Sequence, residues 1–195
     1  VKYRSCDRER RQGGRITAQR SFRSDVFPDK NTNFIKSRRK EGITVVFRSP
    51  PTIIYGKGTV TSVGEPAARF GKKAVLVCGK GSLRKSGVLD IIVSSLEKAG
   101  VSCAVYDRVG SDPTTSDVDE GAAFAKENSC DVIVAAGGGS PLDAAKGIGM
   151  LLTNGGKVTD YEKTAPEKES LPIIAIPTTA GTGSEATRYS VITDT

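Results

Sequence analysis

The chain has 195 residues, of which 37% are hydrophobic and 26% are charged, as is typical of a globular protein with a sizeable core. It contains no histidine, which excludes histidine metal sites, histidine acid–base catalysis and Ser-His-Asp triads. The net charge of +7 comes from residues 1–42, which hold 13 Lys and Arg against 5 Asp and Glu.

Residues 1–42 follow neither the strand nor the helix period, and we expect a disordered basic arm. Arginine clusters bind phosphate backbones, but no interleaved aromatic pattern supports nucleic-acid binding, which is the weaker interpretation. No signal-peptide segment and no apolar run of membrane-spanning length is visible, so we expect a cytoplasmic protein. The four cysteines form no C-x-x-C pair and are expected to be buried reduced thiols: Cys6, Cys78, Cys103 and Cys130.

Residues 43–195 are predicted to form one α/β domain. The expected strands are 43–47, 52–55, 73–78, 101–106, 132–136, 171–176 and 190–193. The expected helices are 60–70, which Pro66 should kink or split, then 86–99, 116–128 and 142–152. The polar stretch 157–170 is expected to be a surface loop. Alternating strands and helices predict a mostly parallel, Rossmann-like sheet with flanking helices.

One stretch, DVIVAAGGGSPLDAAKGIGM at residues 131–150, combines a buried strand, three glycines and a helix start. The glycines let the backbone approach a ligand closely, and a helix N-terminus favours a phosphate or pyrophosphate. The stretch matches neither G-x-G-x-x-G nor G-x-x-x-x-G-K-[ST]. On its own, a tight turn without a ligand explains it equally well.

Three loops that leave predicted strands are rich in glycine or hydroxyl residues: 79–82, 137–140 and 178–184. Ligands of parallel sheets bind beyond the carboxyl ends of the strands, so the three loops together predict a nucleotide site that needs no metal. Ser184 and Glu185 could form a catalytic pair, although a helix N-cap followed by an acid is the simpler interpretation.

Two segments, GGGSPLDAAKGIGM at 137–150 and IPTTAGTGSEATRYSVITD at 176–194, closely resemble the N-terminal domain of iron-dependent, group III alcohol dehydrogenases. The turn at 112–114 and the stretch 73–82 also fit, and the likeness covers residues 43–195. The resemblance implies an NAD(P)-binding α/β domain, with the family's C-terminal all-helical metal-binding domain absent. Family members transfer hydride between small alcohols or aldehydes and NAD or NADP, and iron, sometimes zinc, polarises the substrate oxygen.

The resemblance also implies cofactor-binding residues. The pyrophosphate and the neighbouring ribose would be bound by Gly138, Gly139, Ser140, Pro141 and Asp143. The adenine and phosphate side would be lined by Thr178, Thr179 and Thr182, with Asp112 near the cofactor.

Gly79 departs from the family pattern. Members that prefer NAD often have Asp at this strand end, where it holds the adenosine ribose hydroxyls. A carboxylate would repel a 2′-phosphate and glycine would not, while Lys80 or Arg84 could pair with it. We therefore expect NADP to be accepted.

The family's metal ligands are an Asp and three His in the helical domain. This sequence has no His, and Asp194 precedes the position of the ligand Asp, so the resemblance assigns no metal ligand and no catalytic residue here. We expect the chain alone to be inactive. A homo-oligomer is one option for the complete enzyme, and the sequence leaves the oligomeric state open. The alternatives are a stand-alone nucleotide-binding module without catalysis, or a relative of maleylacetate reductases or polyol dehydrogenases.

Overall fold

The computed structural model describes residues 15–18, 50 and 52–194. Its centre is a four-stranded sheet in the order β3-β2-β4-β5, in which every neighbouring pair is parallel. The strands are β2 (Lys73–Gly79), β3 (Ser102–Val109), β4 (Val132–Gly137) and β5 (Ile173–Pro177). The α/β fold with a parallel, Rossmann-like sheet is therefore confirmed.

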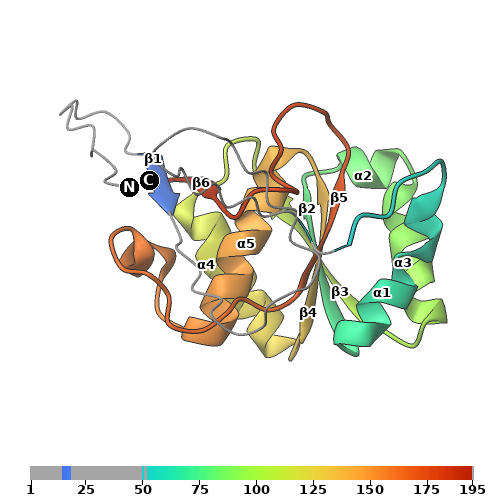
Figure 1. Cartoon of the computed structure of the whole chain (residues 1–195), viewed down its shortest axis with the longest axis horizontal. Helices are drawn as coiled ribbons and strands as arrows, with labels where there is room; N and C mark the ends of the chain where they lie inside the picture. The colour runs from blue at the N-terminus through green and yellow to red at the C-terminus, as the bar shows by residue number, and fades with distance from the viewer. Residues whose placement is uncertain (1–14, 19–49, 51, 195) are drawn as a thin grey trace, which may run out of the picture.

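Helices cover both faces of this sheet (Figure 1). One face carries α1 (Gly64–Phe70), α2 (Ser82–Lys85) and α3 (Val88–Lys98), and the other carries α4 (Thr115–Glu127) and α5 (Gly139–Asn154). Each face has its own apolar core, with Leu76 and Ile92 in one and Ile133 and Ile148 in the other. Burial on both faces explains why β2 and β4 are continuous apolar runs rather than alternating ones.

The predicted strand 52–55 is wrong. Residues 52–55 form no regular structure, and Ile53 and Tyr55 are 74% and 97% exposed. Apolar β-formers need a partner strand to become a strand, and none pairs with this segment among the described residues. The companion strand expected at 43–47 lies outside those residues.

The helix predicted at 60–70 is split, but the break is not at Pro66, where the sequence placed the kink or break. A 3-10 turn, η1 (Thr59–Ser62), precedes α1, and Val63 lies between them. The break comes before Pro66, which occupies the first turn of α1. No intrahelical partner is needed for a backbone N–H there, so proline is tolerated.

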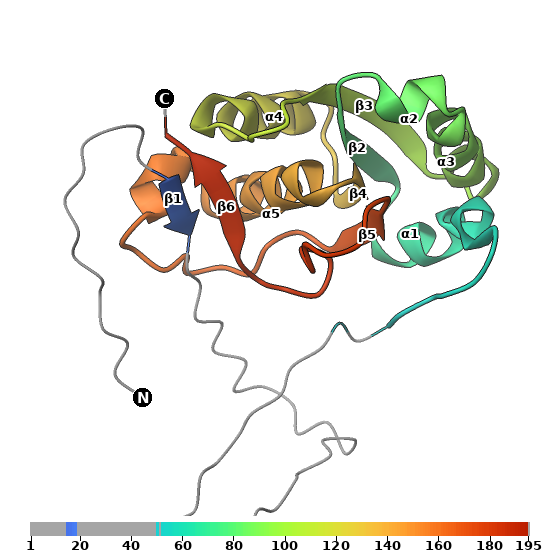
Figure 2. The same cartoon turned by 90° about the horizontal axis from the view of Figure 1, so that it is seen from above.

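Four residues of the basic arm form strand β1 (Arg15–Ala18), which pairs antiparallel with β6 (Ser190–Thr193). Figure 2 shows this small ribbon crossing outside α5, away from the main sheet. The sequence pattern did not indicate a strand at 15–18. The remainder of the arm lies outside the described residues, so its disorder stays a prediction.

Helix α4 and the predicted loop 157–170 complete the main domain. Helix α4 begins with a capping box, in which the backbone N–H of Asp117 donates to Thr114 Oγ1 at 3.1 Å and that of Thr114 donates to Asp117 Oδ2 at 2.9 Å. The predicted loop 157–170 contains a 3-10 turn, η2 (Val158–Tyr161), which buries Val158 in the core.

In the described part of the chain, no helix is both long and apolar enough to cross a membrane.

Candidate functional site

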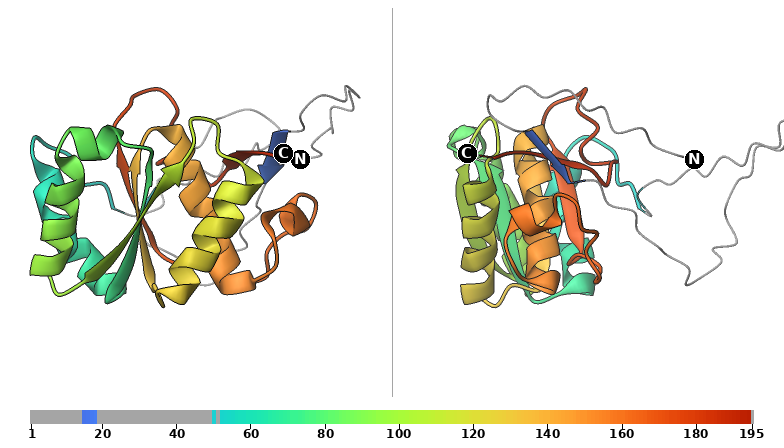
Figure 3. Two further views of the ribbon diagram at one scale, coloured as in Figure 1. Left: turned by 180° about the vertical axis from the view of Figure 1, so that it is seen from behind. Right: turned by 90° about the vertical axis from the view of Figure 1, so that its left-hand side faces the viewer.

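The strand order creates a switch point at one edge of the sheet. From β2 the chain moves to β3 on one side, and from β3 it crosses back to β4 on the other side of β2. The connection that follows β2 therefore leads to one side of the sheet, and the connection that follows β4 leads to the other side. Ligands of open parallel sheets bind in the crevice at such a point. Figure 3 shows α2, the start of α5 and the loop after β5 along this same edge.

The glycine turn after β4 is tightly packed. Gly137 has φ of +140°, and a Cβ atom there would lie 2.5 Å from Cγ of Pro141. Gly138 is the N-cap of α5 and Gly139 its first residue. Pro141 therefore packs back on the turn from the first turn of α5. Residues 137–139 thus place no side chain over the backbone at the N-terminus of a four-turn helix, a position that favours an anion.

The loop after β5 lies directly on this glycine turn. The backbone N–H of Thr178 donates to the carbonyl of Gly137 at 2.8 Å. A Cβ atom on Gly138 would lie 3.3 Å from Thr179 Oγ1, and one on Gly139 would lie 3.1 Å from Thr182 Cγ2. Both of these threonines are exposed. The structure thus brings together the glycines and all three threonines that the sequence singled out.

Two hydrogen bonds connect the segment after β3 with the rest of the site, one to Ser140 at the start of α5 and one from Thr193 of β6 to Asp112. The hydroxyl of Ser140 donates to the carbonyl of Ser111. Asp112 is exposed, and its Oδ1 accepts from Thr193 Oγ1 at 3.0 Å. The residue before Asp112 is thus linked to the start of α5, and strand β6 holds the Asp112 side chain. The contact of Asp112 with a cofactor stays a prediction.

Asp143 is buried, and both of its carboxylate oxygens are already engaged. Oδ1 accepts from Lys146 Nζ at 2.8 Å, and Oδ2 accepts from the backbone N–H of Val191 at 3.1 Å. The hydroxyl of Ser190 donates to the main-chain carbonyl of Asp143. In this structure Asp143 joins helix α5 to strand β6, and its contact with a cofactor stays a prediction.

Lys146 is the polar residue that sequence analysis missed. Besides Asp143, its Nζ donates to the carbonyl of Tyr189 at 2.6 Å and to Thr187 Oγ1 at 3.3 Å. The i, i+3 spacing of Asp143 and Lys146 was a readable signal, since such pairs face one another on a helix. Its other two partners come from more than forty residues away and carry no local signal.

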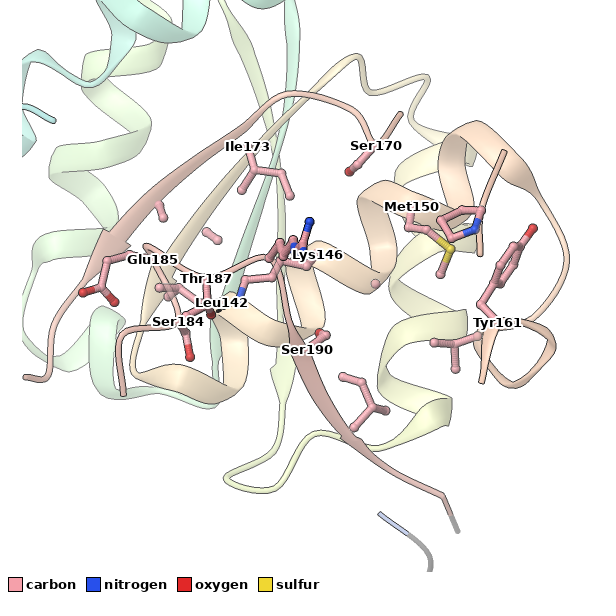
Figure 4. A pocket seen from close by; sticks show the side chains of 17 residues that line it. Leu142, Lys146, Met150, Tyr161, Ser170, Ile173, Ser184, Glu185, Thr187 and Ser190 are labelled. Atoms are coloured by element: carbon pink, nitrogen blue, oxygen red, sulfur yellow. Dashed lines mark hydrogen bonds between the residues drawn. The ribbon is translucent and has the colours of Figure 1, made fainter. Parts of the chain in front are cut away.

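A cavity of about 230 Å³ opens beside Lys146, between α5, β5 and the segment that leads into β6. Figure 4 shows Ser184 and Thr187 on one side of Lys146, and Met150 and Tyr161 on the other. Polar and apolar side chains are mixed along the lining, since Leu142 lies beside Ser184 and Thr187 and Ser170 lies on the side of Met150. Such a lining suits a small organic molecule with a polar group.

At the end of β2, Gly79 is followed by a turn and the short helix α2. Arg84 of α2 forms an ion pair with Asp107 of β3, with 2.9 Å between Nη2 and Oδ2. Burial, and to a smaller extent the Asp107 carboxylate, raise the pKa of the neighbouring Cys78 thiol to about 11. Cys78 is therefore neutral near pH 7, as are Cys103 and Cys130, whose pKa values burial raises to about 12 and about 11.

Two sequence interpretations can be checked directly. The three cysteines in the described part of the chain are free thiols, as predicted, but only Cys78 is buried, whereas Cys103 and Cys130 are half-buried. Cys6 lies outside the described residues. Ser184 does not cap a helix, because residues 184–186 form a turn that the N–H of Ala186 closes on the carbonyl of Gly183. The segment leads straight into β6, so no helix follows.

Comparison with known proteins gives a consistent picture. Residues 50–195 match the family model described as iron-containing alcohol dehydrogenase. The chain is 38% identical over 149 residues to the NAD-dependent methanol dehydrogenase of Bacillus methanolicus, covering 76% of this chain and 39% of that enzyme.

Solved structures agree with this likeness. The alcohol dehydrogenase of an archaeal halo-thermophile from a Red Sea brine pool superposes with a TM-score of 0.71 at 41% identity, over 78% of this chain and 41% of that one. Sulfoacetaldehyde reductase from Bifidobacterium kashiwanohense, solved in complex with NAD+, has a TM-score of 0.67 at 27% identity, over 78% and 44% of the two chains. The chain thus spans about two fifths of the length of these relatives.

Proposed function

Because this chain belongs to the iron-containing alcohol dehydrogenase family, we propose that its α/β domain is the NAD(P)-binding half of an enzyme that interconverts small alcohols and aldehydes or ketones. The dinucleotide lies across the carboxyl ends of β2, β4 and β5. Its pyrophosphate is bound at the glycine turn that begins α5.

One observation carries this proposal: the threonine loop after β5 closes on the glycine turn after β4 at the switch point of the sheet. Thr179 approaches Gly138 and Thr182 approaches Gly139 so closely that a Cβ atom at either glycine would require the threonine to shift. A cradle of main-chain groups and hydroxyls at a helix N-terminus suits a pyrophosphate, which needs many hydrogen-bond donors and little side-chain bulk.

In this proposal the chain's own residues bind and orient the cofactor. Gly138, Gly139 and Ser140 hold the pyrophosphate, Pro141 keeps the turn closed, and Thr178, Thr179 and Thr182 line the adenine and phosphate side. The nicotinamide supplies the hydride acceptor or donor, which is chemistry that no side chain can provide. Asp143 and Lys146 fix β6 against α5 and thereby the wall of the adjoining cavity.

Iron does not fit the residues of this chain. The sequence has no His, and the described residues include no group of three or more His, Cys, Asp or Glu that could hold a metal ion. A site for Fe²⁺ or Zn²⁺ needs several such ligands around one point. We therefore assign no step to a metal here and expect no alcohol oxidation by this chain alone.

NADP is accepted at the adenosine end, and Gly79 is the reason. A Cβ atom at this position would meet nothing closer than the carbonyl of Val109 at 3.6 Å, so the backbone does not require glycine. The missing carboxylate removes the repulsion of a 2′-phosphate, and Lys80 and Arg84 are exposed cations close by in the sequence. The free thiols suit a reducing compartment, for which we propose the cytoplasm.

An activity assay run beside a binding assay tests the proposal. The chain is incubated with ethanol or 1,3-propanediol, NAD+ or NADP+, and Fe²⁺, and the absorbance of the reduced nicotinamide is followed while calorimetry measures cofactor binding. Binding without turnover is expected. Turnover would overturn the half-enzyme assignment, and binding of neither cofactor by folded protein would overturn the cofactor site itself.

A further inference from the structure

The exposed ion pair between Arg84 and Asp107 stands at the adenosine end of the proposed site. Arg84 lies in α2, directly after the turn that leaves β2, and Asp107 lies in the neighbouring strand β3. Nη2 and Oδ2 are 2.9 Å apart, and the two side chains are 60% and 36% exposed. Both charges can therefore be reached from solvent.

A register shift in the sheet brings Asp107 to the end of β2. Val77 pairs with Tyr106, but Gly79 pairs with Val109, so residues 107 and 108 both lie opposite Cys78. Such a bulge re-aims side chains at a sheet edge.

The pair is free to change partners. Within the described residues, neither side chain forms another hydrogen bond or ion pair. Exposed ion pairs contribute little to stability, so a ligand can replace one member without unfolding the site. Arginine binds a phosphate with its planar fork, and a carboxylate accepts hydrogen bonds from vicinal ribose hydroxyls.

We propose that this ion pair sets the selectivity between the two dinucleotides. Arg84 leaves Asp107 to bind the 2′-phosphate of NADP(H), and Asp107 accepts from the adenosine ribose hydroxyls of NAD(H) in place of the carboxylate that Gly79 lacks. The site thus takes both dinucleotides. This inference rests on the proposed cofactor site and assigns its specificity to two residues.

Titration of the whole chain with NADPH and with NADH, followed by the fluorescence of the reduced nicotinamide, tests the inference. The variants are Asp107→Asn and Arg84→Gln, with Lys98→Gln as a matched loss of one exposed positive charge. Lys98 ends α3, which runs back to the opposite edge of the sheet, just before β3 begins. The quantity compared is the ratio of the Kd for NADH to the Kd for NADPH.

Asp107→Asn frees Arg84 and replaces the charged ribose acceptor with a weaker, neutral amide oxygen, so the ratio should rise about tenfold, and Arg84→Gln should lower it about tenfold. Lys98→Gln should leave it within about twofold of the unaltered chain, because the charge is far from the ligand. Ratios that stay at the control value while both cofactors bind would overturn the inference and leave the cofactor site standing. Failure of the unaltered, folded chain to bind either cofactor would overturn the proposed function.

Discussion

Thr179 Oγ1 lies 3.3 Å from the point that a Cβ atom on Gly138 would occupy. The loops after β4 and β5 therefore meet at a position where only glycine leaves both in place. Gly138 directly follows β4 and Thr179 closely follows β5, and the two strands are adjacent and parallel. The contact therefore lies at the carboxyl ends of both strands, where ligands of such sheets bind.

Replacing Gly138 with Val should abolish tight cofactor binding. The added methyl groups would displace Thr179 and fill the space over the N-terminus of α5, so the Kd for NADPH should rise at least about tenfold. Ala123→Val is the control, because it adds the methyl groups of valine at an exposed position in the second half of α4, where the backbone is helical. NADPH titration of both variants checks the prediction. Equal affinities in the two would show that the glycine turn does not contact the ligand.

Asp143→Asn should destabilise the domain far more than Asp107→Asn. The Asp143 and Lys146 side chains are only 11% and 16% exposed, so neutralising one leaves a buried charge without its partner, at a cost of about 2–4 kcal/mol. The exposed Asp107 pair contributes less than about 1 kcal/mol.

Urea unfolding followed by circular dichroism measures both free energies of unfolding. The two substitutions are isosteric, so they differ mainly in burial and partners. Losses of similar size would mean that Asp143 does not hold α5 to β6.

Gly79→Asp should shift the preference toward NADH. The backbone at Gly79 accepts a side chain, and the new carboxylate would repel a 2′-phosphate while accepting hydrogen bonds from ribose hydroxyls. The Kd for NADPH should rise about tenfold or more. Gly79→Asn, which has the same shape without the charge, is the control. A shift of equal size with Asn would assign the effect to bulk instead of charge.

Alkaline pH should lower the stability of the fold. Burial raises the pKa values of Cys78 and Cys130 to about 11 and that of Cys103 to about 12, whereas an unfolded thiol titrates near about 8.5. Above that value the unfolded chain loses protons that the folded chain retains. The stability linked to these thiols is therefore fully present below about pH 8 and is lost as the pH rises through about 11.

Urea unfolding at several pH values between 7 and 10.5 checks this expectation, with a loss of about 1–2 kcal/mol per thiol by pH 10. Cys78→Ala removes one of the titrating groups and should flatten the decline. An unchanged slope in this variant would contradict the assigned role of Cys78.

The sequence was sufficient for the main sheet because burial on both faces gives β2 and β4 uninterrupted apolar runs that few other structures explain. The glycine turn and the threonine loop were also predictable, since their residue types restrict the backbone or present hydroxyls. The same pattern of apolar β-formers gave a wrong strand prediction at 52–55. A strand forms only where a partner strand is available, and composition does not reveal that partner.

The contacts that complete the site were beyond sequence reasoning. Arg84 and Asp107 are 23 residues apart and meet through a register shift that no local signal announces. Lys146 reaches Tyr189 across 43 residues, and Asp143 reaches Val191 across 48. These are tertiary contacts, set by where β6 crosses α5.

The most direct test of the cofactor site is to titrate the purified chain with NADPH and NADH and follow the nicotinamide's own fluorescence, which is the useful signal because the sequence has no Trp. We predict saturable binding of both, tighter for NADPH. No change in fluorescence on adding either dinucleotide, in a chain that circular dichroism shows to be folded, would contradict the assignment of this domain as a dinucleotide-binding module.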